Sequence, residues 1–128
     1  MKTLIIIPSR MSATRLPGKP LLKINGLSII SHVFKRAESA DVGEVVVATE
    51  DQEIIDDIES NGGHAVLTSK NNKTGTDRIF EAFKILGRND IDLIMNVQGD
   101  EPDIDTNDIK ILDNRMKKNN SKMGTLAA

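Results

Sequence analysis

The sequence predicts an α/β domain with a doubly wound, mostly parallel sheet. Short apolar runs alternate with longer stretches of helical periodicity, which is the pattern of successive βαβ units. The first apolar run, Leu4–Ile7, does not alternate with polar residues, as expected for a strand that helices cover on both faces. With 128 residues, the chain has the length of about one domain.

The first half of the chain predicts strand–helix units in succession. The strand Leu4–Ile7 is followed by a helix over Ser28–Ala40, whose apolar side chains share one face. Val45–Ala48 is a β-branched run typical of a strand. Asp51 is expected to cap the next helix, which has isoleucines on its inner face, and Gly62-Gly63 is expected to end it.

The second half repeats the pattern. His64–Leu67 predicts a short strand, and the polar loop Thr68–Lys73 leads to a helix with Ile79 on its apolar face. Asp92–Val97 predicts the next strand, and a further helix is expected from about Thr106. Alternation of strands and helices therefore continues along the whole chain.

The last residues, Met123–Ala128, resemble the start of another strand. A free domain rarely ends within a strand, because a turn or a polar tail normally follows. We therefore expect this chain to be a fragment of a longer protein, truncated at its C-terminus, with residues 1–128 forming a nucleotide-binding part.

Composition excludes several classes of protein. The net charge of -2 and the pI of about 5.7 argue against a general nucleic-acid binder. The absence of cysteine excludes disulfides, thiolate catalysis and cysteine-based zinc sites, and it fits a reducing cytoplasm. No segment of the sequence is long and apolar enough for a membrane span.

The segment Pro8–Pro20, directly after the first strand, predicts a phosphate-binding loop. Arg10, Arg15 and Lys19 supply forked and point-like positive charges, a combination suited to a polyphosphate. Gly18 lets the backbone approach a ligand. The same segment contains the hydroxyls of Ser9, Ser12 and Thr14.

This loop is not a P-loop. A match ending at Gly18-Lys19 requires glycine at position 13 and serine or threonine at position 20, where Ala13 and Pro20 stand. The alternative is an ordinary solvated basic loop. The density of cations, the flanking prolines and the position after the first strand favour the phosphate-binding hypothesis.

Two further segments follow the same logic. Gln98 and Asp100 come after the strand Asp92–Val97, and the carboxyl ends of parallel strands meet at one edge of a sheet. Asp100 is a hard oxygen ligand suited to Mg²⁺, whereas a simple Gly-Asp turn is the alternative. The segment Thr74–Arg78 either caps a helix or uses Gly75 and its free N–H groups to contact a base, and the residues leave both hypotheses open.

Two of these segments resemble the 3-deoxy-manno-octulosonate (KDO) cytidylyltransferase family, also called CMP-KDO synthetases. The first is Arg15-Leu16-Pro17-Gly18-Lys19-Pro20-Leu21 with Ile7–Arg10 before it, and the second is Asn96–Pro102. Segments 47–49 and 75–78 fall where the family would place them, and the similarity extends over all 128 residues. The resemblance implies a nucleotide-diphosphosugar-transferase fold, which is Rossmann-like.

The resemblance also implies a reaction and its participants. A cytidylyl group would pass from CTP to KDO, giving CMP-KDO and pyrophosphate for lipopolysaccharide biosynthesis, in a Mg²⁺-dependent cytoplasmic homodimer. By position, Arg10, Lys19 and Asp100 would be catalytic, with Asp100 as the metal ligand. The substrate contacts implied are Pro8, Ser9, Arg10, Arg15, Lys19, Thr74, Gly75, Thr76, Arg78, Gln98 and Asp100.

Two alternatives to this function remain. In the first, the acceptor is another acidic sugar, such as a sialic acid or amino-KDO. In the second, the chain is a non-catalytic nucleotide-binding fragment. Members of the family are longer, and the additional part carries a second magnesium carboxylate and much of the sugar pocket. The 128 residues alone are therefore expected to bind CTP weakly and to be almost inactive.

Overall fold

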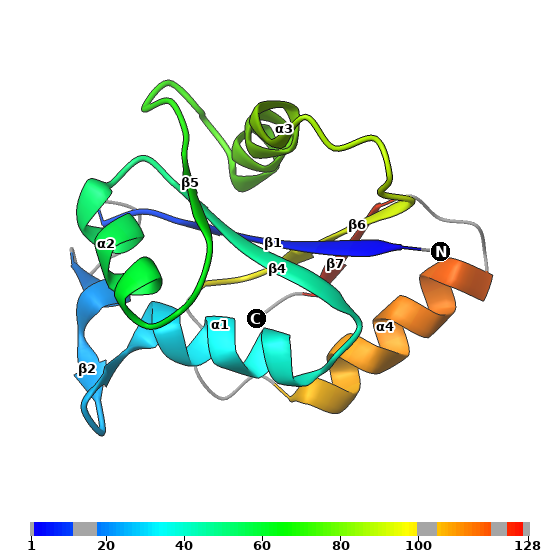
Figure 1. Cartoon of the computed structure of the whole chain (residues 1–128), viewed down its shortest axis with the longest axis horizontal. Helices are drawn as coiled ribbons and strands as arrows, with labels where there is room; N and C mark the ends of the chain where they lie inside the picture. Colours follow the sequence, from blue (N-terminus) through cyan, green and yellow to red (C-terminus); the bar gives the residue numbers. More distant parts are fainter. Residues whose placement is uncertain (1, 12–17, 100–104, 119–122, 127–128) are drawn as a thin grey trace.

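A five-stranded parallel sheet forms the middle layer of the molecule, in the order β5-β4-β1-β6-β7 (Figure 1). The computed structural model describes residues 2–11, 18–99, 105–118 and 123–126. The strands of this sheet are β1 (Thr3–Ser9), β4 (Gly43–Thr49), β5 (Ala65–Leu67), β6 (Leu93–Val97) and β7 (Met123–Leu126). The predicted parallel sheet is confirmed, and each expected strand lies within two residues of its predicted start and end.

The strand order contains one reversal of direction. From β1 the chain moves to β4 and β5 on one side of the sheet, then crosses over to β6 and β7 on the other side. The reversal separates the carboxyl ends of β1 and β6, and such a topological switch point is where open α/β sheets bind ligands. The end of β1 at Ser9 lies in register with Thr49 of β4, so these two strands end at the same level.

Helices cover both faces of the sheet, which confirms the doubly wound prediction. The helices are α1 (Ile29–Ser39), α2 (Gln52–Ser60), α3 (Gly75–Leu86) and α4 (Thr106–Lys118). Helices α1, α2 and α4 lie on one side of the sheet and α3 lies on the other (Figure 1). No helix in the described part of the chain is long and apolar enough to cross a membrane.

The central strand β1 serves two separate cores. Ile5 and Ile7 point to the core beneath α1, α2 and α4, whereas Leu4 and Ile6 point to the core beneath α3. All four side chains are fully buried, which explains why the sequence of β1 shows no polar alternation. Burying each of them contributes about 1.5–3 kcal/mol of hydrophobic free energy.

Helix α1 begins as predicted, with Ser28 as its N-cap. The hydroxyl of Ser28 accepts a hydrogen bond from the backbone N–H of Ser31 at 3.2 Å. The predicted inner face of this helix is buried throughout. Asp51 also stands at the predicted N-cap position of α2, but its side chain does not cap that helix. It accepts a hydrogen bond from the backbone N–H of Met11 instead, at 2.8 Å.

A small hairpin before α1 was not predicted. It consists of β2 (Lys23–Ile24) and β3 (Leu27–Ser28), and it follows a short 3₁₀ helix, η1 (Lys19–Leu21). The turn residues Asn25 and Gly26 both have positive φ angles, of 53° and 82°. An Asn-Gly pair is the strongest short-range signal for such a turn.

Candidate functional site

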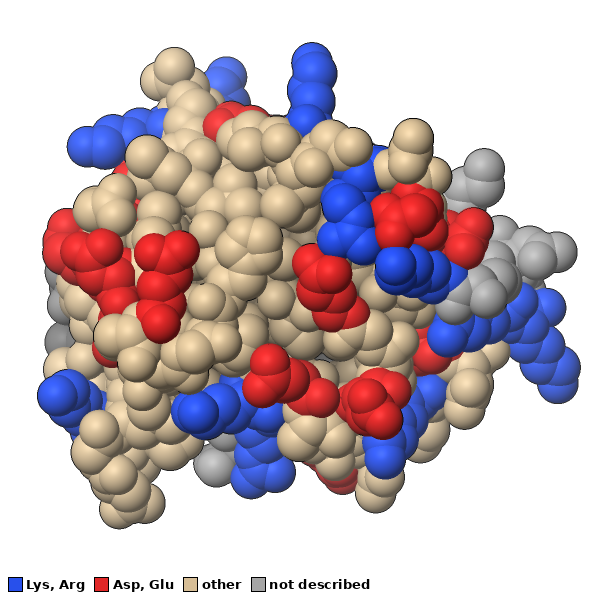
Figure 2. All heavy atoms as spheres, in the orientation of Figure 1, with Lys and Arg blue, Asp and Glu red and all other residues tan. Residues whose placement is uncertain are grey.

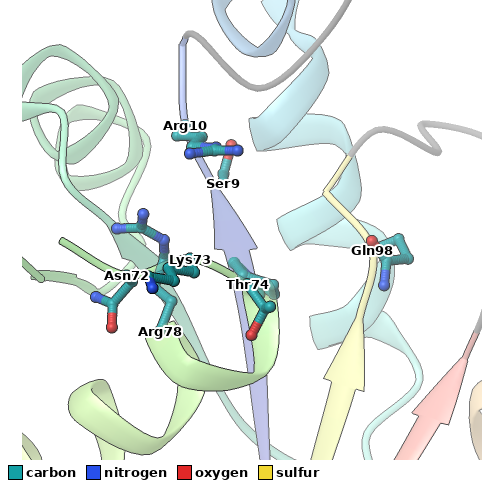
Figure 3. Close-up of a pocket in the computed structure, with 9 residues that line it drawn as sticks. Ser9, Arg10, Asn72, Lys73, Thr74, Arg78 and Gln98 are labelled. Carbon is teal, nitrogen blue, oxygen red and sulfur yellow. The ribbon is translucent and has the colours of Figure 1, made fainter. Parts of the chain in front are cut away.

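A polar pocket lies at the carboxyl edge of the sheet, at the switch point between β1 and β6. It has a volume of about 200 Å³, and three segments of the chain contribute to it (Figure 3). Its lining consists of Pro8, Ser9, Arg10, Asn72, Lys73, Thr74, Gly75, Arg78 and Gln98. Most ligand pockets enclose about 300–1,000 Å³, so this volume suits part of a nucleotide.

The end of β1 forms the centre of the pocket. Ser9 and Arg10 lie between Gln98 on one side and the segment before α3 on the other (Figure 3). Gly99 allows this close arrangement, because a Cβ atom at that position would lie 3.0 Å from the backbone oxygen of Pro8. A side chain at position 99 would therefore push the end of β6 away from the end of β1, and Gln98 with it.

The N-terminus of α3 forms one wall of the pocket. The Thr74 hydroxyl caps this helix by accepting a hydrogen bond from the backbone N–H of Asp77 at 3.1 Å. Thr74 and Gly75 face the pocket, so the positive end of the helix macrodipole is directed into it. The first-turn N–H groups of a helix are a common binding site for phosphate.

Arg78 lies behind this wall and is bound to neighbouring side chains. It is only 3% exposed, and its guanidinium donates to Glu50 at 3.0 Å and to the Thr68 hydroxyl at 2.5 Å. Because breaking a buried ion pair costs far more than breaking an exposed one, this contact fixes the start of α3 relative to the end of β4. The predicted substrate contact therefore lies in the pocket lining with its charge already compensated.

The pocket is positively charged within an acidic chain. Its lining contains Arg10, Lys73 and Arg78 and no carboxylate. Arg78 is paired with Glu50, whereas neither Arg10 nor Lys73 forms an ion pair within the described ranges. With a net charge of -2 on the whole chain, this local excess of positive charge favours an anionic ligand.

Most of the predicted site residues are brought together here. The pocket contains Pro8, Ser9, Arg10, Thr74, Gly75, Arg78 and Gln98. Lys19 begins η1, and Thr76 lies within the first turn of α3; neither is part of the lining. Arg15 and Asp100 lie outside the described residues, so their predicted roles stay predictions.

Sequence reasoning missed Asn72 and Lys73. Both were treated as part of an ordinary polar loop, yet they line the pocket directly before the N-cap Thr74. Asn72 is held by hydrogen bonds to the Ser69 carbonyl at 3.0 Å and to Glu81 at 2.9 Å. A lysine immediately before a helix N-terminus was the available signal, because the cation and the helix dipole attract the same anion.

The predicted magnesium ligand, Asp100, lies outside the described residues. Among the residues that the structure describes, no group of three or more acidic, histidine or cysteine side chains is arranged around a common point. Asp100 follows Gly99 in the sequence, and its role as a magnesium ligand stays a prediction that rests on the preference of Mg²⁺ for carboxylate oxygens.

A parallel α/β sheet with a cationic pocket at its switch point, next to a helix N-terminus, places the chain among open α/β proteins, the class in which such a pocket commonly binds phosphate groups. The chain belongs to the cytidylyltransferase family, whose profile matches residues 4–128. The family prediction made from the two sequence motifs is therefore confirmed.

Named relatives agree with this assignment. The 3-deoxy-manno-octulosonate cytidylyltransferase of Nitrobacter winogradskyi is 44% identical over 99% of this chain and 50% of that protein. The 8-amino-3,8-dideoxy-manno-octulosonate cytidylyltransferase of Shewanella frigidimarina is 49% identical over 82% of this chain and 43% of that protein. A solved structure of CMP:2-keto-3-deoxy-manno-octonic acid synthetase complexed with CTP matches with a TM-score of 0.83 and 38% identity, covering 92% of this chain and 48% of the other. The chain thus spans about half the length of these relatives.

Proposed function

We propose that residues 1–128 supply the CTP-binding part of an enzyme that transfers a cytidylyl group from CTP to 3-deoxy-D-manno-octulosonate. The products are CMP-KDO and pyrophosphate, and CMP-KDO is the product that serves lipopolysaccharide biosynthesis. The observation that carries the proposal is the pocket lining, which contains Arg10 and Lys73 without any carboxylate and includes the N-terminus of α3. A triphosphate is the part of CTP that such a lining suits best.

The proposed chemistry is a direct attack of a sugar hydroxyl on the α-phosphate, with pyrophosphate as the leaving group. Ser9 and Thr74 are the hydroxyls in the pocket, and its described lining contains no histidine or carboxylate to activate either of them. A covalent intermediate on the protein is therefore not part of the proposal. Arg10, Lys73 and the start of α3 instead hold the phosphates and stabilise charge that develops on their oxygens.

Magnesium and assembly belong to the same proposal. When bound, Mg²⁺ would polarise the α-phosphate and lower the pKa of the attacking hydroxyl. The sequence resemblance gives Asp100 as its ligand, and Arg15 and Lys19 as further phosphate contacts. A homodimer and a cytoplasmic location are also proposed, on the same resemblance and on the absence of cysteine.

The test is pyrophosphate release by the complete gene product with CTP, Mg²⁺ and KDO. Release that needs all three components is the expected result. In the same assay, Asp100→Ala should abolish magnesium-dependent turnover while the protein stays folded, because the proposed metal ligand is gone. Near-normal rates in this variant would remove Asp100 from the metal site.

A second acceptor is kept as an alternative because relatives named for both sugars match this chain at similar identity. A Rhodopseudomonas palustris relative named for KDO is 52% identical over 105 residues, and the Shewanella frigidimarina relative named for the 8-amino sugar is 49% identical over 106 residues. A panel of KDO, its 8-amino analogue and a sialic acid would distinguish the acceptors. Release with another sugar but not with KDO would refute KDO as the acceptor, and CTP binding without release from any sugar would favour a non-catalytic nucleotide-binding protein.

A further inference from the structure

A backbone hydrogen bond joins Met11, just after β1, to Gly18, and we call this joined pair the Met11–Gly18 neck. The backbone N–H of Gly18 donates to the carbonyl of Met11 at 2.9 Å, and Gly18 has a φ angle of 82° that only glycine adopts easily. Arg10 directly precedes this neck and Lys19 directly follows it. The position of the Met11–Gly18 neck therefore decides where both basic residues leave the backbone.

A carboxylate from the connection between β4 and α2 holds the neck. Asp51 Oδ2 accepts a hydrogen bond from the backbone N–H of Met11 at 2.8 Å, between residues 40 positions apart. Such a charge-assisted bond is about twice as strong as a neutral one. Asp51 therefore links the end of β4 to the residue next to Arg10.

Asp51 is itself rigidly placed. Its backbone N–H donates to the Thr49 hydroxyl at 3.1 Å, and Thr49 is fully buried. Its carbonyl accepts the N–H groups of Ile54 and Ile55, at 3.1 and 3.3 Å, which begin α2. The backbone on both sides of the Asp51 side chain is thus fixed, as an anchor for the Met11 N–H requires.

The use of this carboxylate is unusual for its position. An aspartate at a helix N-cap normally accepts a hydrogen bond from the second or third residue of its own helix. Asp51 forms no such bond, and its side chain contacts the neck instead. Asp51 also places a negative charge near a pocket that suits an anion. Because this charge does not attract an anionic ligand, its presence there indicates another role for the Asp51 side chain.

We propose that Asp51 is a positioning residue for nucleotide binding. By holding the Met11 N–H, it fixes the Met11–Gly18 neck and keeps Arg10 directed at the triphosphate. This inference rests on the proposed function, since it names CTP as the ligand of the pocket. It assigns the effect to the hydrogen bond that Asp51 accepts from Met11, and not to repulsion between the Asp51 charge and the ligand.

Three variants separate these effects. Asp51→Ala removes the accepting oxygen, whereas Asp51→Asn keeps an accepting oxygen and removes the charge. Asp56→Ala is the matched control, because Asp56 is an exposed carboxylate on the same helix whose partner is Gln52. The measurements are the Kd for CTP by calorimetry with Mg²⁺, the KM for CTP of the complete gene product, and hydrogen exchange of the Met11 amide.

Asp51→Ala is expected to weaken CTP binding about 10- to 100-fold and to raise KM by a similar factor, as for the loss of one hydrogen bond to a charged group. Asp56→Ala should stay within about 3-fold of the wild type, and Asp51→Asn should lie between the wild type and Asp51→Ala, because a neutral hydrogen bond is weaker than a charge-assisted one. The Met11 amide should be protected in the wild type and in Asp51→Asn, and should exchange rapidly in Asp51→Ala.

The inference would be overturned by equal CTP affinity for the wild type and Asp51→Ala, or by a Met11 amide that is unprotected in the wild type. An Asp51→Asn variant as weak as Asp51→Ala would also overturn it, by assigning the effect to charge. If Asp51→Ala does not fold, the Asn variant and the wild-type exchange still decide. If the wild type does not bind CTP but its Met11 amide is protected, the proposed function is overturned, whereas the hydrogen bond between Asp51 and Met11 is supported.

Discussion

The two ends of the sheet use the same basic residue types in opposite ways. At the amino end, Arg88 contacts Glu44 at 2.9 Å and Asp90 at 2.8 Å, and Lys2 contacts Asp90 at 2.6 Å. Figure 2 shows acidic and basic side chains side by side at this end, on the right of the view. At the carboxyl end, Arg10 and Lys73 face a pocket whose described lining has no carboxylate.

The difference separates a structural role from a binding role. At the amino end, basic side chains join the start of β1 to the connection before β6, and their charges cancel locally. At the carboxyl end, the positive charge that remains is available to a ligand. Whether a carboxylate lies beside a basic residue therefore indicates its role, structural or ligand-binding, better than the number of arginines and lysines in the region does.

The largest expected effect is at the pocket. Arg10→Ala should lower kcat/KM for CTP by about 100-fold or more, because a charge that stabilises the transition state is lost. The matched control is Arg88→Ala, which removes the same side chain from the opposite end of the sheet. Steady-state kinetics of the complete gene product checks both. A similar loss in the two variants would break the proposed distinction between the ends.

A second effect concerns the paired cation within the pocket wall. Glu50→Ala should destabilise the fold by about 3–5 kcal/mol, because it leaves the charge of Arg78 buried without its partner. Urea unfolding measures this loss. Glu44→Ala at the exposed end is the control and should change the unfolding midpoint far less. A loss for Glu50→Ala no larger than that of the control would mean that Arg78 is not held by this pair.

The smallest expected effect is on pH dependence at the amino end. Hydrogen bonds from Arg88 and then from Lys2 hold the pKa of the Asp90 carboxyl well below its ordinary value. Because the folded pKa is lower than the unfolded one, this contribution to stability is complete above about pH 5 and decreases as the pH falls further.

Solvent exposure makes this contribution small, so the comparison is between variants. The decrease in the urea midpoint between pH 5 and pH 3 should be slightly smaller for Arg88→Ala than for the wild type. An identical decrease in the two proteins would show that the Arg88–Asp90 contact does not couple to folding.

The parts of the fold that were predicted depend on local patterns. Leu4–Ile7 and the inner face of α1 follow from the order of apolar residues along the chain, which is why both predictions agree with the structure. The hairpin at Asn25-Gly26 carried a local signal of the same kind that was overlooked.

The site was predictable only as far as topology could be inferred. Ser9, Arg10 and Gln98 were expected together because parallel strands end at one edge of the sheet, and the pocket brings them together. The bond between Asp51 and Met11 joins residues 40 positions apart, and no local pattern indicates it. The pairing of Arg78 with Glu50 was missed for the same reason.

The close approach of Gly99 to Pro8 has a consequence for how this pocket can change during evolution. A Cβ atom at position 99 would lie 3.0 Å from the Pro8 backbone oxygen, so the absence of a side chain there allows the present spacing between the ends of β1 and β6. Under the proposed function, replacing Ser9 or Gln98 one at a time would then change the contacts to a ligand while Gly99 keeps this spacing.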